Sequence, residues 1–68
     1  MKPVSGREFA KLLEGRGWEL ARVQGSHHIY RHTGRPERIS LPIHGSRQLK
    51  LGLQRHLMKI AGIADSDL

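Results

Sequence analysis

Three of the five histidines in this 68-residue chain, together with its only tyrosine, lie in the stretch Gln24–His32. A glycine and a serine, Gly25 and Ser26, precede the histidines in this stretch. Histidine is the side chain whose unperturbed pKa, about 6.5, lets it both accept and release a proton near neutral pH. This concentration of histidines is compatible with a metal site, with a solvated polar surface, or with acid–base catalysis.

Strand geometry weighs against the metal site. If the stretch is a strand, alternation places His27 on one face and His28 and His32 on the other. The chain has no cysteine, and few carboxylates lie nearby in sequence to complete a zinc shell. We therefore predict no metal site and no other cofactor. A solvated or hydrogen-bonded role is the default for any single histidine.

Acid–base chemistry is the remaining interpretation, and it requires a suitable substrate. Beside arginines that hold a phosphodiester, a histidine could help a ribose 2′-hydroxyl attack the adjacent phosphate. Such cleavage needs no metal and leaves a cyclic phosphate.

The charge of the chain favours a nucleic-acid partner. Twelve lysines and arginines stand against six aspartates and glutamates, which gives a net charge of +6 and a pI near 10.9. Most of the cations are arginines, whose planar guanidinium suits phosphate contacts. A small basic domain is typical of nucleic-acid binding, although a basic surface can also serve solubility or bind an acidic protein. A core this small favours stabilisation by oligomerisation or by a protein partner.

The ends and hydropathy of the chain predict a soluble, cytoplasmic protein without a membrane partner. The start, Met1-Lys2-Pro3-Val4, has no apolar run behind its charge, so we expect no signal peptide. No apolar stretch approaches the roughly 18 residues that a membrane span needs.

Two helices are predicted by their caps and by apolar spacing. Ser5 and Glu8 form the pattern of a capping box, and Val4 and Phe9 the pattern of a hydrophobic staple. The pair Gly17-Trp18 is a typical helix stop. A second helix is predicted over about 49–61, with the apolar stripe Leu53, Leu57, Ile60 and Ala61 and the stop Gly62-Ile63.

Three strands are predicted between these helices, over residues 18–23, 26–31 or 32, and 38–41. A turn or bulge at Gln24-Gly25 joins the first two strands, and Pro42 is expected to stop the third. Short connections imply an antiparallel sheet covered on one face by the helices. We therefore predict a single α+β domain over residues 1–68, in the order α-β-β-β-α. Residues 63–68 are expected to form a short frayed tail.

This order resembles that of the double-stranded-RNA-binding domain, and the residues resemble one family in particular. The stretch Gly25–His32 is similar to the signature of the HicA family of bacterial toxins. The resemblance covers almost the whole chain, and its motifs follow one another in the same order as in the family. It includes Gly17-Trp18, Arg22, Leu41-Pro42-Ile43-His44-Gly45, Lys50–Arg55 and Ile60-Ala61-Gly62-Ile63. A departure is Leu53-Gln54, where relatives usually carry Thr-Leu.

The resemblance implies a double-stranded-RNA-binding-like fold and a ribosome-independent endonuclease that cleaves mRNA. It also implies a HicB antitoxin that covers the active face. In the family pattern the first histidine of the pair is catalytic, which places the role on His27, with His28 as its rival. Strand alternation alone leaves the choice open, because burial of Tyr30 would turn His27 outward, whereas burial of Ile29 would turn it inward.

RNA contacts are predicted at a set of basic and turn residues: Arg22, Gly25, Ser26, Arg31, Arg47 and Lys50. Ser26 is better explained as a turn-stabilising hydroxyl than as a nucleophile, because no base is evident for it. His44 follows the proline that is expected to end the third strand and could lie near the site, although capping or solvation explains it better. We expect a structural role for His56. The alternative to a nuclease is a module that binds RNA and carries out no chemistry.

Overall fold

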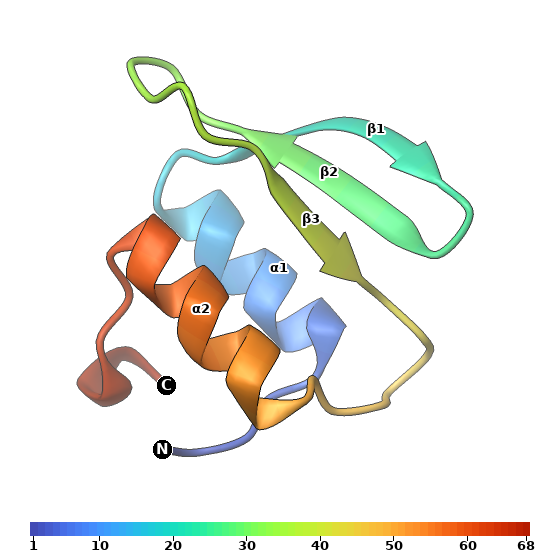
Figure 1. Ribbon diagram of the computed structural model, residues 1–68, viewed down its shortest axis with the longest axis vertical. Coiled ribbons are helices and arrows are strands. Elements are labelled where there is room, and N and C mark those ends of the chain that lie inside the picture. Colours follow the sequence, from blue (N-terminus) through green and yellow to red (C-terminus); the bar gives the residue numbers. More distant parts are fainter.

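The structure, a computed structural model, describes residues 1–68 and contains two helices and one antiparallel sheet (Figure 1). The three strands lie in the order β1-β2-β3, so each pairs with its neighbour in the chain. The predicted α+β class and the order α-β-β-β-α are confirmed. The elements are α1 (Gly6–Gly15), β1 (Glu19–Gln24), β2 (His27–Arg31), β3 (Ile39–Pro42), α2 (Leu51–Ala61) and a final 3-10 turn, η1 (Asp65–Asp67).

The predicted caps of α1 are confirmed. The Glu8 amide donates to Ser5 Oγ at 3.1 Å, and the Ser5 amide donates to Glu8 Oε1 at 2.8 Å. This second bond, to the charged carboxylate, holds the pKa of Glu8 below its ordinary value. At the other end Gly17 adopts a φ of +89°, and the Trp18 amide donates to the Leu13 carbonyl at 3.0 Å. The same arrangement ends α2, where the Ile63 amide donates to the Met58 carbonyl at 3.0 Å.

The core lies between the helices and one face of the sheet. The strands contribute Tyr30, Ile39 and Leu41, and α1 and α2 contribute Phe9, Leu13, Leu57, Met58 and Ala61. Tyr30 is only 2% exposed, and its hydroxyl donates to Glu14 Oε2 of α1 at 3.3 Å. Because both helices pack on the face that carries Tyr30, the predicted one-sided covering of the sheet is confirmed.

Burial of Tyr30 determines which way the histidines of β2 face. Alternation turns Tyr30 and the half-buried His28 toward the helices, and it turns His27, Ile29 and Arg31 outward. Of the two orientations that the sequence allowed, the structure has the one in which the tyrosine is inside. We call the opposite surface, which faces away from the helices, the outer face.

The turn or bulge predicted at Gln24-Gly25 is a turn, and the sheet has its bulge elsewhere. Gly25 and Ser26 form a regular two-residue hairpin turn, in which Gly25 has a φ of +59°. The register shifts instead between Leu20 and Arg22. Leu20 pairs with Tyr30 on the helix side, whereas Arg22 pairs with Ile29 on the outer face. The bulge therefore brings Arg22 to the same face as His27.

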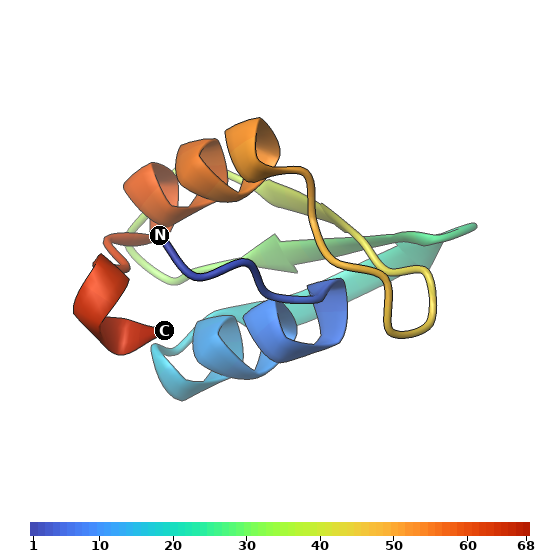
Figure 2. The same ribbon diagram turned by 90° about the horizontal axis from the view of Figure 1, so that it is seen from below.

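Gln54 is a buried polar residue that the apolar stripe did not predict. It is fully buried on α2, where its Oε1 accepts from the Val4 amide at 3.0 Å and its Nε2 donates to the Lys2 carbonyl at 2.7 Å. These bonds satisfy both ends of the amide and tie the N-terminal segment to the helix. Figure 2 shows this segment running between α1 and α2.

The C-terminal residues differ from the predicted frayed tail. Ile63 is buried, and the 3-10 turn that follows is held by Asp67, whose Oδ2 accepts from the Ala64 amide at 2.8 Å and pairs with Arg16 Nη2 at 2.7 Å. This pair is partly exposed, so it orders the turn more than it stabilises the fold. No helix of the structure combines the length and apolar character that a membrane crossing requires.

The Tyr30–Glu14 contact predicts a stability difference that depends on pH. Burial, together with the adjacent Glu14 carboxylate, raises the pKa of Tyr30 above its ordinary value of 10.0. The contribution of Tyr30 to the free energy of unfolding is therefore complete below its unfolded-state pKa of about 10. This contribution is lost as the pH rises through the higher pKa that Tyr30 has in the folded protein. Tyr30→Phe should therefore be about 1 kcal/mol less stable than the wild type at pH 7, with the difference closing above pH 10.

Urea denaturation of both proteins between pH 7 and pH 11 measures this difference. Other groups that titrate in alkali are common to both proteins and cancel. A difference that stays constant across the range would contradict the assigned contact.

Candidate functional site

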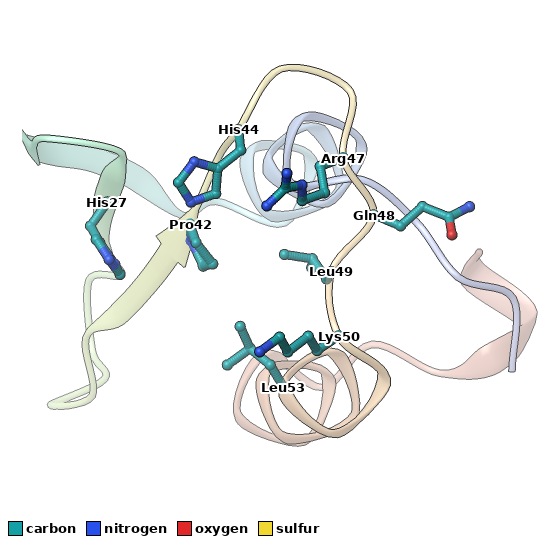
Figure 3. Close-up of a pocket in the computed structure, with 8 residues that line it drawn as sticks. All are labelled: His27, Pro42, His44, Arg47, Gln48, Leu49, Lys50 and Leu53. Carbon is teal, nitrogen blue, oxygen red and sulfur yellow. The ribbon is translucent and has the colours of Figure 1, made fainter.

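An open pocket of about 390 Å³ lies where the start of β2 meets the loop between β3 and α2 (Figure 3). Four cationic or titratable side chains line it, His27 from β2 and His44, Arg47 and Lys50 from the loop. Apolar surface is supplied by Pro42, Leu49 and Leu53. The pocket therefore combines proton-transfer groups, positive charge and an apolar surface.

His27 is held by a polar neighbour on β3. Its Nδ1 lies 3.2 Å from Ser40 Oγ, within hydrogen-bond distance. Ser40 is opposite Ile29 in the register, so both members of the contact lie on the outer face. The Nε2 atom makes no hydrogen bond within the protein, and the side chain is exposed. The contact orients the ring and leaves one nitrogen free to exchange a proton with a bound molecule.

The loop that completes the pocket is anchored at both ends. The Ile43 amide donates to the Ser26 carbonyl at 2.8 Å, which extends the pairing of β2 and β3 by one bond beyond Pro42. The Leu49 amide donates to the Val4 carbonyl at 2.9 Å, and the Leu49 side chain is buried. Arg47 and Lys50, on either side of this anchor, are thereby held near β2 although they are distant in sequence.

The charge around the pocket is of one sign. Arg47 and Lys50 are exposed, and no carboxylate lines the pocket. Neither cation forms an ion pair within the protein, because the single salt bridge joins Arg16 to Asp67. No group of three or more histidine and carboxylate side chains is placed to hold a metal ion. Free cations beside a free imidazole are suited to an anionic ligand such as a phosphodiester.

The other predicted RNA-binding residues lie outside the pocket, with Arg22 and Arg31 on the outer face. Arg31 is four residues from His27 on the same strand, which corresponds to roughly 13 Å. Arg22 is exposed on β1, and Gly25 and Ser26 form the hairpin turn next to His27. The structure thus brings Arg47 and Lys50 together with His27, and it leaves Arg22 and Arg31 farther along the sheet.

The remaining strand histidines have different surroundings. His28 faces the helices and is opposite the buried Leu41 in the register. His32 lies edge-on to the Trp18 ring at 5.2 Å, with Nε2 3.0 Å from the Arg16 carbonyl and Nδ1 2.7 Å from the Thr33 carbonyl. The Nε2 contact holds the end of α1 against the end of β2, and the Nδ1 contact is local to the turn after β2. His56 is exposed on α2 and does not line the pocket.

The sequence favoured capping or solvation for His44 over a position near the site, whereas the structure places His44 in the pocket lining. Its side chain lines the pocket with His27 and forms no hydrogen bond within the protein. The spacing of His44 in the sequence indicates its proximity to His27, because His44 comes two residues after Pro42 and Pro42 is the cross-strand partner of His27. The pairing of β2 with β3 could not be read from the sequence in sufficient detail to use that spacing.

The comparison with protein families agrees with the resemblance of the sequence. A family model described as HicA toxin of bacterial toxin-antitoxin matches residues 6–63 of the chain. The chain belongs to the HicA toxin family. A search of curated proteins finds no match. The matched range includes both helices, the whole sheet and every residue that lines the pocket.

In this HicA toxin the first turn of α1 supports the pocket from the helix side. Gly6 is buried, and a Cβ at this position would lie 3.0 Å from Ile43 Cγ1 and closer still to the Pro42 carbonyl oxygen. Glycine is therefore required for α1 to approach the end of β3. Gly52 in the first turn of α2 is different, because a Cβ there would meet no atom within 4 Å.

This difference gives a matched pair of substitutions. Gly6→Ala should lower the free energy of unfolding by about 1–3 kcal/mol, because the added methyl group pushes α1 away from Pro42 and Ile43. Gly52→Ala should leave stability unchanged or raise it by up to about 1 kcal/mol, because alanine favours helix. Urea denaturation measures both values. Equal stability of the two variants would contradict the close packing of α1 against β3.

Proposed function

We propose that this HicA toxin is an endoribonuclease that cleaves mRNA without a metal ion, with His27 as a general acid or base. The toxin would act by removing messages, which arrests growth. The observation that carries the proposal is the position of His27, which has a free Nε2 in a pocket lined by unpaired cations.

The chemistry follows from the groups in the pocket. A ribose 2′-hydroxyl becomes a better nucleophile when a neighbouring base takes its proton, and histidine is suited to this task near neutral pH. Positive charge from Arg47 and Lys50 would stabilise the negative charge that builds up on the phosphate oxygens in the transition state. The polar groups that line the pocket are basic or neutral, which supports a mechanism that depends on imidazole and cations.

The outer face would carry the rest of the RNA. Arg31 and Arg22 lie on the same face as His27 and extend the positive charge away from the pocket. Contacts of this kind position the phosphate backbone without selecting bases. Gly25 and Ser26, in the turn beside His27, would contact the RNA backbone through their main chain.

The neutralising partner would be an acidic protein of the HicB type that covers this face. A chain with a net charge of +6 and free cations around the pocket is electrostatically matched to such a protein.

Binding of this partner should protect the exposed Lys50 from an amine-reactive reagent and suppress cleavage of RNA. A complex in which Lys50 remains as reactive as in the free toxin would place the partner elsewhere.

The proposed role of His27 is tested by paired substitutions in excess chelator. His27→Ala should lower kcat/KM for RNA cleavage by about 10²–10⁴-fold, because proton transfer by a positioned side chain contributes this much. His28→Ala should retain most of the activity, since this side chain faces the helices. Cleavage of end-labelled RNA gives the rates, and RNA retention at several salt concentrations reports binding separately.

The outcomes are distinct. Activity lost in His28→Ala and kept in His27→Ala would transfer the role to His28. Salt-dependent RNA binding without any product, even by the wild type, would identify a non-catalytic RNA-binding module. Cleavage that stops in chelator would contradict the metal-independent mechanism.

A further inference from the structure

His44 shares the pocket with His27 but comes from a different element (Figure 3). His27 stands at the start of β2, and His44 stands in the loop after β3. Of the five histidines in the chain, these two alone line the pocket. Their surroundings also match, because both are exposed and both have a ring nitrogen without a partner in the protein.

The backbone of His44 is fixed on both sides. The preceding residue, Ile43, is bonded to the Ser26 carbonyl at 2.8 Å, and the His44 carbonyl accepts from the Arg47 amide at 3.0 Å. The first bond ties the loop to the turn that leads into His27, and the second forms a tight turn that includes Gly45, with a φ of +57°. The two histidines therefore have a defined spatial relation although 16 residues separate them.

Cleavage of RNA by its own 2′-hydroxyl requires two proton transfers. The 2′-oxygen forms a bond to phosphorus, and its proton passes to a base. The bond from phosphorus to the 5′-oxygen breaks, and that oxygen takes a proton from an acid, which leaves a 2′,3′-cyclic phosphate and a 5′-hydroxyl. In an in-line displacement the attacking and leaving oxygens lie on opposite sides of phosphorus. A single imidazole is poorly placed to serve both oxygens, whereas two imidazoles from different elements can serve one each.

We propose that His44 is a second catalytic residue of this toxin and forms an acid–base pair with His27. The proposal rests on the endoribonuclease activity proposed above and adds the group that completes its proton balance. In the pair, one imidazole accepts the proton of the 2′-hydroxyl while the other, as imidazolium, protonates the leaving 5′-oxygen. Arg47 and Lys50 line the same pocket and hold the phosphate between the two imidazoles.

The test compares two substrates with His44→Ala, His27→Ala and the wild type. One substrate is an RNA oligonucleotide that contains the phosphodiester cleaved most readily by the wild type. The other is the same oligonucleotide with sulfur in place of the bridging 5′-oxygen at that bond, because a thiolate leaves without needing a proton. His56→Ala serves as the matched control, since His56 is exposed on α2 outside the pocket.

On the oxygen substrate His44→Ala should lower kcat by about 10²-fold or more while KM changes by less than about threefold, and His56→Ala should match the wild type. On the sulfur substrate one of the two pocket variants should recover a rate near that of the wild type. The variant that recovers lacks the general acid, and the one that stays slow lacks the general base. Unchanged circular dichroism and unfolding midpoints confirm that the exposed substitutions leave the fold intact.

Two results would overturn the pair. One is a kcat for His44→Ala within about threefold of the wild type on the oxygen substrate. The other is a loss that the sulfur substrate restores in neither variant, which would make His44 a group that binds phosphate without transferring a proton. If the wild type fails to cleave RNA at all, the proposed nuclease activity is wrong, and the pair fails with it. If the wild type cleaves RNA and His44→Ala is equally active, only the proposed acid–base pair is wrong, and the proposed nuclease activity stands.

Discussion

Burial of Tyr30 is the constraint on which the site depends. Its ring lies in the core between the helices and the sheet, and its hydroxyl reaches Glu14 on α1. Because side chains alternate along a strand, this one buried aromatic turns His27 and Arg31 to the opposite face. A slip of one residue in β2 would exchange the two faces and take His27 out of the pocket. The position of the reactive histidine is thus a consequence of core packing.

The pocket also depends on contacts between segments that are distant in sequence. The loop that carries His44, Arg47 and Lys50 is held to the hairpin turn through Ser26 and to the N-terminal segment through Val4. Val4 is in turn bonded to Gln54 of α2. The charged and titratable groups of the site therefore come from one strand and one loop, which the packing of both helices fixes relative to each other. A small domain can achieve this because nearly every element contacts the same core.

The sequence predicted those features that follow from local rules. The capping box of Ser5 and Glu8, the glycine helix stops and the order of elements were readable because each depends on residues close together in the chain. The features that were missed depend on tertiary contacts. Gln54 can be buried because its side-chain amide forms hydrogen bonds with two backbone groups of the N-terminal segment. The bulge between Leu20 and Arg22 depends on the pairing of β1 with β2. The neighbourhood of His27 and His44 likewise follows from the register of β2 and β3.

The central claim is that imidazole groups in this pocket catalyse attack by the 2′-hydroxyl of RNA on the adjacent phosphate. The chemical ends of the RNA fragments test this claim most directly, because they record which nucleophile attacked. Incubation of the purified protein with RNA in excess chelator, followed by mass spectrometry of the fragments, should give 2′,3′-cyclic phosphate and 5′-hydroxyl ends. Fragments with 5′-phosphate and 3′-hydroxyl ends would show that water attacked instead, and would contradict the account.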